Sequence, residues 1–349
     1  MKVRVRFPSR AQMKKIGLSI ILLLVFSCRS PQDTGRFISE TDTTYSADVR
    51  SISAKINLHP HDPELFYRRG NTFYFEGKFR DAGFDFDHAI KLNPKQALYH
   101  LKIAECFISM DSADSKKTQY HLLQALDIKP DFTEAKSLLA KFYLARQQYK
   151  ESMILYEELC GILEYQDNAF VMMSLAYKEQ KDSIAAEATI DKALAINPEN
   201  FDAVMQKTLF LIAKNKLPLA MQWAQKAVRM NEYSDEANYT LGLVFQKQNR
   251  FADALSYYLR VLKINPNFIL AYYNSAVIES SFENFLIGIE WCDKILALDP
   301  NYANALAIKG YCYEKLGNKK EALDHYQLAL ELNPNLILAE EGIKIMKKP

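Results

Sequence analysis

The sequence predicts an all-α protein built from stacked pairs of antiparallel helices. Composition is the first reason: the 349 residues include only 11 glycines and 12 prolines, and 49% are hydrophobic, which favours helices over turn-rich strands. The spacing of the prolines is the second reason. Successive intervals are 34 residues or twice 34, apart from one of 36, among Pro60, Pro94, Pro130, Pro198, Pro266, Pro300 and Pro334. A period of this length indicates an array of helical repeats, whose size is not limited by a single core.

Residues 1–27 predict a secretory signal peptide. They hold six cations and no acid, and residues 16–26 form an apolar run about half as long as a membrane-spanning helix. The run ends in Val25-Phe26-Ser27-Cys28, which resembles the lipobox of bacterial lipoproteins except at Phe26, where a small residue is usual. The resemblance implies that Cys28 becomes the first mature residue and carries acyl chains. An uncleaved short anchor is the alternative.

Residues 28–46 predict a flexible tether. They are rich in Ser, Thr and Asp and show no apolar period. As a coil they would reach roughly 20 to 25 Å from a membrane. Without the six cations of residues 1–27 the formal net charge of +2 becomes −4, so the mature chain offers no basic footprint for nucleic acid.

The helical array follows the tether. Residues 47–62 predict a capping half repeat, because Ile52 and Ile56 stand where the second helix of a repeat would place them. Eight units of 34 or 36 residues follow in register, at 63–96, 97–132, 133–166, 167–200, 201–234, 235–268, 269–302 and 303–336. Residues 337–349 predict a polar closing helix. Terminal caps of this kind keep an open array soluble.

Small residues recur at two points of each unit. The eighth position holds Gly70, Ala104, Ala140, Ser174, Thr208, Gly242, Ala276 and Gly310. Twelve positions later stand Ala82, Thr118, Ser152, Ala186, Ala220, Ala254, Gly288 and Ala322, where Thr118 aligns after a two-residue insertion. Aromatic residues recur between them, at Phe73, Phe107, Tyr143, Tyr177, Phe245 and Tyr313, and then at Phe86, Tyr156, Tyr258 and Tyr326. Small residues let the two helices of a hairpin approach closely, while the aromatic residues fill the remaining space.

This pattern resembles the tetratricopeptide repeat (TPR) family, which places aromatic, small and proline residues at fixed offsets within 34 residues. The best matching unit is Gly310-Tyr313-Ala322-Tyr326-Ala329-Pro334, and the first unit matches through Phe66-Gly70-Phe73-Ala82-Phe86-Ala89-Pro94. The resemblance covers about residues 47–349. It implies a right-handed superhelical solenoid, whose first helices line a concave groove that holds a protein or peptide.

In the family, positions 2, 5, 9, 12 and 13 of each unit face the groove. Carried over to this chain, the partner-binding residues are Tyr67, Asn71, Tyr74, Phe75, Leu101, Glu105, Ile108, Val171, Leu175, Met205, Leu209, Ile212, Tyr239, Leu243, Tyr273, Val277 and Tyr311. Most of them are apolar or aromatic, which favours an extended or helical segment with apolar anchors as the ligand. The alternative is that curvature buries them against neighbouring helices.

Some members of the family capture a terminal carboxylate with Lys and Asn in successive units. Asn71 occupies one such position, but Tyr67 stands where the lysine should be, so a chaperone-tail ligand is not expected.

The sequence contains no motif typical of a catalytic site. Cys106, Cys160, Cys292 and Cys312 fall on helical positions that predict buried thiols, and a Cys292–Cys312 disulfide is the alternative for one pair. His59-Pro60-His61-Asp62 is interpreted as a turn between helices rather than as a metal site. We therefore expect no enzyme activity, no metal and no cofactor.

Two departures from the repeat pattern stand out. Glu279 occupies the eleventh position of its unit, where six other units place an aromatic residue. It either reaches solvent or a lysine, or marks a partner contact. Residues 112–117 lengthen one turn and predict a surface loop.

Together, these expectations predict a scaffold or adaptor that is lipid-anchored in the envelope of a Gram-negative cell and faces the periplasm. Arg29 follows Cys28 in place of the aspartate associated with inner-membrane retention, which favours the outer membrane. Two alternatives remain: an adaptor that regulates a periplasmic protease or modifying enzyme, and a cytosolic co-chaperone. The partner and the oligomeric state stay open, because function lies in the surface of a generic binding frame.

Overall fold

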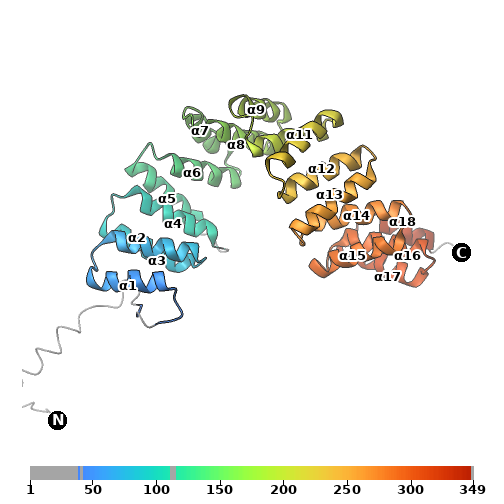
Figure 1. Ribbon diagram of the computed structural model, residues 1–349, viewed down its shortest axis with the longest axis horizontal. Coiled ribbons are helices and arrows are strands. Elements are labelled where there is room, and N and C mark those ends of the chain that lie inside the picture. The colour runs from blue at the N-terminus through green and yellow to red at the C-terminus, as the bar shows by residue number, and fades with distance from the viewer. Residues whose placement is uncertain (1–37, 40–41, 111–114, 347–349) are drawn as a thin grey trace, which may run out of the picture. The chain divides into compact units, whose positions relative to one another are not determined.

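The computed structural model describes residues 38–39, 42–110 and 115–346, and these form helices joined by short turns (Figure 1). The all-α class that the sequence predicted is confirmed for this part of the chain. The predicted signal peptide, Cys28 and most of the tether lie outside the described residues, as do residues 112–114 of the insertion and 347–349 of the closing helix. None of the described helices is both long and apolar enough to cross a membrane.

The chain divides into two compact units, of which unit 1 ends at Leu155. Unit 1 contains α1 (Ala47–Leu58), α2 (Pro63–Phe75), α3 (Phe79–Leu92), α4 (Ala97–Ser109), α5 (Ser115–Ile128) and α6 (Thr133–Ala145). The boundary falls within α7 (Tyr149–Cys160).

Unit 2 begins at Tyr156 and continues the same alternation of helices. It contains α8 (Gln166–Glu179), α9 (Ser183–Ile196), α10 (Phe201–Ala213), α11 (Leu217–Met230), α12 (Asp235–Lys247), α13 (Phe251–Ile264), α14 (Ile269–Ser281), α15 (Phe285–Leu298), α16 (Ala303–Lys315), α17 (Lys319–Leu332) and α18 (Ile337–Met346). In each unit the helices stack as antiparallel pairs (Figure 1).

Capping residues set the start of several first helices. The side chains of Asp62, Asn200 and Ser234 each precede a first helix and accept a hydrogen bond from one of its free backbone N–H groups. Such caps satisfy donors that have no partner within the helix. All eight first helices, capped or not, begin at or within one residue of the predicted repeat starts, α8 beginning at Gln166 instead of Asp167.

The core of each hairpin is a small residue facing a buried aromatic ring. A Cβ atom on Gly70 would come within 2.7 Å of the Phe86 ring, and one on Gly310 would come equally close to Tyr326. Both rings are fully buried. A larger side chain at either glycine would push the two helices apart, which is why the eighth position stays small.

A left-handed residue recurs in the turn between the two helices of a pair. Positive φ angles occur at Gly77 (73°), Gln147 (60°), Lys181 (64°), Asn215 (55°), Asn249 (60°), Glu283 (64°) and Gly317 (81°). From Gln147 onward these residues are 34 apart, so the turn is part of the repeat. The sequence shows this turn weakly, since only two of the seven residues are glycine.

A buried ion pair joins the first three helices. The Arg69 guanidinium donates two hydrogen bonds of 2.7 Å to the Asp85 carboxylate and a third, of 3.0 Å, to Ser53 Oγ. All three side chains are buried, and Ser53 Oγ in turn donates to the carbonyl oxygen of Val49. Since a bidentate pair satisfies most of its polar atoms, the charges can be held inside the protein.

The structure corrects the predicted tether. Ile38 is only 2% exposed and belongs to a core cluster with Val49 and Phe73, while the Tyr45 ring packs on the edge of Phe73 at 6.0 Å. Lys78 Nζ lies 5.3 Å from the centre of the Tyr45 ring. The prediction of a flexible segment through residue 46 is therefore wrong for Ile38 and Tyr45, because their apolar side chains find a place in unit 1.

Candidate partner-binding site

The predicted groove residues of unit 1 come from α2 and α4. Phe75 is 87% exposed and Ile108 is 43% exposed, so both offer apolar surface. Tyr74 is half-buried: its hydroxyl lies 3.3 Å from Ser109 Oγ, and its ring packs against Phe75 and Phe79. Large exposed apolar side chains on one helix face are candidates for partner contacts.

The remaining groove residues of unit 1 are more enclosed. Tyr67 packs between the rings of Phe86 and Tyr99, at 5.9 and 5.3 Å, and Asn71 is half-buried. Glu105 accepts a hydrogen bond of 2.8 Å from Lys102 Nζ. The Tyr67 ring occupies the place of the missing lysine, so these residues do not form a carboxylate clamp.

Two predicted groove residues are wrong. Leu101 and Val171 are each 3% exposed. Both lie at the fifth position of a repeat, where the first helix of the following repeat covers a side chain of their size. Leu101 packs with Ala135 of α6, and Val171 with Val204 of α10, in the cores of their own units. A partner cannot reach either side chain without unfolding part of the array.

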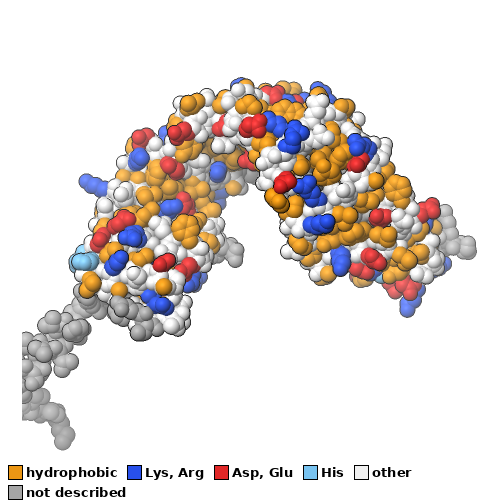
Figure 2. All heavy atoms as spheres, viewed as in Figure 1, with side chains coloured by type: hydrophobic (Ala, Val, Ile, Leu, Met, Phe, Trp, Pro, Cys, Tyr) orange, Lys and Arg blue, Asp and Glu red, His pale blue; other side chains and the backbone are white. Residues whose placement is uncertain are grey.

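The groove residues of unit 2 are partly accessible. Leu209 is 42% exposed, whereas those that are half-buried are Leu175, Met205, Ile212, Tyr239, Leu243, Tyr273, Val277 and Tyr311. Tyr239 is held by its hydroxyl, which accepts a hydrogen bond of 3.1 Å from Asn274 Nδ2, and by its ring, 5.1 Å from that of Phe268. Figure 2 shows hydrophobic side chains over much of the visible face of each unit, interspersed with both charges.

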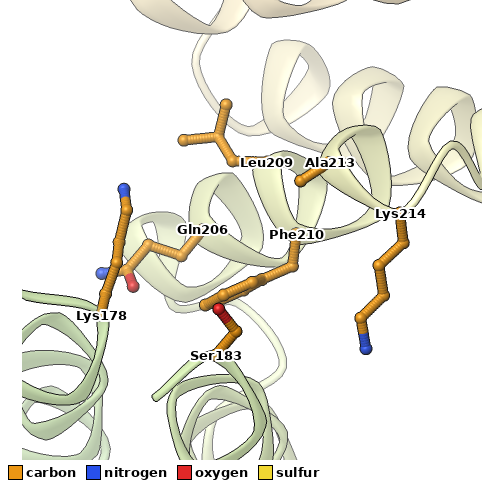
Figure 3. Close-up of a pocket in the computed structure, with 7 residues that line it drawn as sticks. All are labelled: Lys178, Ser183, Gln206, Leu209, Phe210, Ala213 and Lys214. Carbon is orange, nitrogen blue, oxygen red and sulfur yellow. The ribbon is translucent and has the colours of Figure 1, made fainter. Parts of the chain in front are cut away.

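A pocket of about 470 Å³ lies beside Leu209 in unit 2. Its lining comes from the end of α8, the start of α9 and the length of α10, and consists of Lys178, Ser183, Gln206, Leu209, Phe210, Ala213 and Lys214. Lys178 and Lys214 stand on opposite sides of the Phe210 ring, which points toward Ser183 (Figure 3). The pocket thus combines an apolar floor with a cation at either side.

The two lysines differ in their ion pairs. Lys214 pairs with Glu187, which also accepts a hydrogen bond of 3.3 Å from Lys207. The hydrogen bond from Lys214 is the main cause that lowers the pKa of Glu187. Lys178 is exposed and forms no salt bridge with any residue that the structure describes. Its charge is therefore available to an acidic group on a partner.

Sequence reasoning found only one of the seven pocket residues, Leu209. The same register could have found two more, because Lys178 stands at position 12 of its unit and Ala213 at position 13. Phe210 and Ser183 stand at positions 10 and 17 of their repeats, which lie outside the groove register.

The cysteines give no reactive centre. Cys106, Cys292 and Cys312 are buried and Cys160 is partly buried, and all four are free thiols, so the alternative of a Cys292–Cys312 disulfide is not observed. Burial is the first cause that raises the pKa of each thiol, to about 12 for Cys106. Neutral buried thiols are poor nucleophiles and poor metal ligands.

The other singled-out residues have structural partners. Glu279 accepts a hydrogen bond of 2.7 Å from Asn284 Nδ2 across the turn that follows its helix. His59 and His61 are exposed in the turn before α2. Within the described part of the chain, no three His, Cys, Asp or Glu side chains gather closely enough to hold a metal ion.

Comparison with known proteins identifies the class to which this architecture belongs. Models of the tetratricopeptide repeat family match residues 167–200, 236–268 and 303–336. The chain therefore contains tetratricopeptide repeats, and its fold is a solenoid of such repeats. Proteins of this kind bind other proteins or peptides.

Particular relatives extend the similarity over more of the chain. DnaJ homolog subfamily C member 7 of Mus musculus is 22% identical over 312 residues, covering 84% of this chain and 58% of its own length. The crystal structure of PilW, a type IV pilus biogenesis factor, is similar with a TM-score of 0.55 and 20% identity, over 61% of this chain and 99% of PilW. The crystal structure of the APC/C hetero-tetramer Cut9–Hcn1 is similar with a TM-score of 0.59 and 14% identity, over 90% of this chain and 61% of that one. At these identities the likeness establishes the fold, and the chain spans less than two thirds of the mouse relative.

Proposed function

We propose that this protein is an interaction scaffold, lipid-anchored in a bacterial cell envelope through Cys28, that holds a segment of another protein against its first helices. The observation that carries the binding proposal is the pocket in unit 2, where Leu209 and Phe210 lie between Lys178 and Lys214. An apolar side chain of the partner fills the pocket, and an acidic residue beside it meets Lys178. Apolar anchors supply most of the affinity, while the charge fixes the register of the segment.

The location of the scaffold is part of the proposal. The basic residues 1–15, the apolar run 16–26 and Cys28 support a lipid-anchored protein of the envelope, and Arg29 favours the outer membrane. The partner is then a component of an envelope complex.

Two other roles use the same surface. An adaptor that delivers clients to a periplasmic protease would bind them in this pocket, and a degradation assay separates it from a passive scaffold. A cytosolic co-chaperone is suggested by the names of relatives such as Hsp70-Hsp90 organizing protein 2 of Arabidopsis thaliana, 23% identical over 56% of this chain. The Tyr67 ring in the clamp position argues against that role.

Affinity purification from native membranes tests the proposed site. We expect the double variant Lys178→Glu with Leu209→Ser to recover about tenfold less partner than the unmodified chain, because an anchor and its charged neighbour are lost together. Both side chains are exposed, so the fold should survive, and a thermal melt verifies this. Cys28→Ser should abolish incorporation of a labelled fatty acid into the chain.

The matched control is Leu286→Ser with Lys294→Glu, which makes the same changes at exposed positions of α15. The control should recover the partner in full. Equal recovery by both double variants would rule out the pocket as the binding site. Fatty-acid labelling of Cys28→Ser equal to that of the unmodified chain would rule out the lipid anchor.

A further inference from the structure

The second helices of the three complete repeats that begin in unit 1 share a surface feature that the proposed pocket does not use. Each has a cation as its second residue, namely Arg80 in α3, Lys116 in α5 and Lys150 in α7, and all three are exposed. Four residues later each carries a large apolar side chain, Phe84, Tyr120 or Ile154, exposed by 67, 56 and 57%. Residues four apart lie on one face of a helix, so each helix presents a cation beside an apolar group. We name these six residues the basic–apolar ridge.

The ridge follows the repeat register but is confined to unit 1. Its residues occupy positions 18 and 22 of three successive repeats, once the two-residue insertion in the second repeat is allowed for. In the five repeats of unit 2, position 18 holds Ile184, Pro218, Ala252, Leu286 and Lys320. Position 22 of the same repeats holds Ala188, Gln222, Ser256, Glu290 and Asp324. The same fold is therefore built without this pairing, and packing does not explain it.

The three cations stand at unfavourable places for helix stability. The first turn of a helix carries the positive end of its dipole, so acidic residues stabilise it and basic residues weaken it. Arg80, Lys116 and Lys150 repeat the unfavourable choice three times, although Asp81 and Glu151 offset part of it in α3 and α7. None of the three cations forms a salt bridge with another described residue. Because this loss of helix stability recurs at the same repeat position, we interpret the cations as binding a ligand that carries negative charge.

The basic surface is narrow. Three residues beyond Phe84 and Ile154 stand Asp87, which pairs with Lys91 at 2.9 Å, and Glu157. Asp81 and Glu151 directly follow the cations of α3 and α7, whereas Lys117 follows Lys116 in α5. The first turns of the three helices therefore keep a small net positive charge, next to the apolar side chains. The basic–apolar ridge is therefore suited to lie along an extended surface rather than to enclose a compact ligand.

We propose that the basic–apolar ridge rests on a phospholipid surface with anionic headgroups. The cations pair with headgroup phosphates, and Phe84, Tyr120 and Ile154 enter the boundary between headgroups and acyl chains. Three equivalent pairs on the second helices of successive repeats match a fluid array of identical headgroups, whereas an acidic protein would need a matching carboxylate at each place.

The length of the preceding chain supports this occupant. Ile38 is fixed in unit 1, and only ten residue steps separate it from Cys28. A fully extended chain of that length spans at most about 35 Å. This step depends on the proposed acylation of Cys28, which would hold unit 1 beside the membrane.

Photo-crosslinking of the full chain in vesicles tests the ridge. p-Benzoylphenylalanine replaces Phe84 in one preparation and Glu290, the matched residue of α15, in another. The vesicles contain phosphatidylcholine alone or with phosphatidylglycerol. We expect lipid adducts at position 84 to exceed those at position 290 about tenfold when phosphatidylglycerol is present.

Charge reversal supplies the second arm. Arg80→Glu, Lys116→Glu and Lys150→Glu together should lower adducts at position 84 to the level of position 290. The control combines Lys216→Glu, Lys263→Glu and Lys294→Glu, three exposed lysines of unit 2, and should leave them unchanged.

The outcomes separate the ridge from the anchor. Equal yields at positions 84 and 290 on vesicle-bound chain, or no effect of the ridge reversal, would refute the ridge alone. A chain that stays in solution with every vesicle would refute both the anchor and the ridge. Adducts in native membranes to an acidic protein in place of lipid would replace the membrane by that protein as the occupant.

Discussion

His100 and His121 bring their Nδ1 atoms within 3.1 Å of each other between α4 and α5. Burial is the first cause that lowers the pKa of both rings, to about 4 for His121, where the charges of His100 and Lys117 act in the same direction and Asp87 opposes them. Both histidines are consequently neutral in the folded protein near neutral pH. The sequence alone does not indicate this pair, because the two histidines are 21 residues apart and only the fold brings their rings together.

This pair predicts a loss of stability in mild acid. An unfolded histidine takes up a proton near pH 6.5, whereas folded His121 does so only near pH 4. The unfolded state therefore binds more protons between these values, and the free energy of unfolding falls as the pH drops through that window. We expect a loss on the order of 2 kcal/mol at pH 4, measured by urea denaturation.

His121→Gln should remove much of this pH dependence, since glutamine does not titrate. His61→Gln, at an exposed histidine in a turn, is the control and should retain it. A pH dependence that is the same in all three proteins would contradict the assignment.

At the scale of the helix pair, the sequence predicted the elements well and their connections less well. Small residues such as Gly70 and rings such as Phe86 are required by close packing at a fixed offset, so the register of the pairs can be read from the spacing of these residues in the sequence. The left-handed turn residue escapes the same method, because Lys181 and Glu283 adopt the conformation without being glycine. Of the pocket, only Leu209 was predicted. Its two lysines and Phe210 stand at different repeat positions, so no single periodic pattern brings them together in the sequence.

The turn register gives a stability prediction. Glu283 has a φ of 64°, a conformation that costs a residue with a Cβ roughly 1–2 kcal/mol. Glu283→Gly should raise the free energy of unfolding by about 0.5–1 kcal/mol, after the greater freedom of glycine in the unfolded chain is subtracted. The urea midpoint provides the measurement.

Glu290→Gly is the matched change in the middle of α15, where φ is helical, and should lower stability by about 1 kcal/mol. If both glycines lower the midpoint equally, the turn at Glu283 is not strained.

At the scale of the whole molecule, repetition explains why so little of the function could be predicted. Each unit contacts mainly its neighbours, so the fold tolerates different surfaces on different units. The pocket beside α10 and the ridge on α3, α5 and α7 are two such surfaces, one in each unit. The groove register located part of the first, but the burial of Leu101 and Val171 shows that position alone does not decide exposure.

Hydrogen–deuterium exchange on the full chain, with and without the partner recovered from membranes, tests the central claim that a partner segment is held against the first helices. The account predicts slower exchange at the end of α8 and along α10, beside Lys178 and Phe210, with the outer helix α11 unchanged. Protection confined to second helices such as α11 and α13, or none around the pocket, would contradict it.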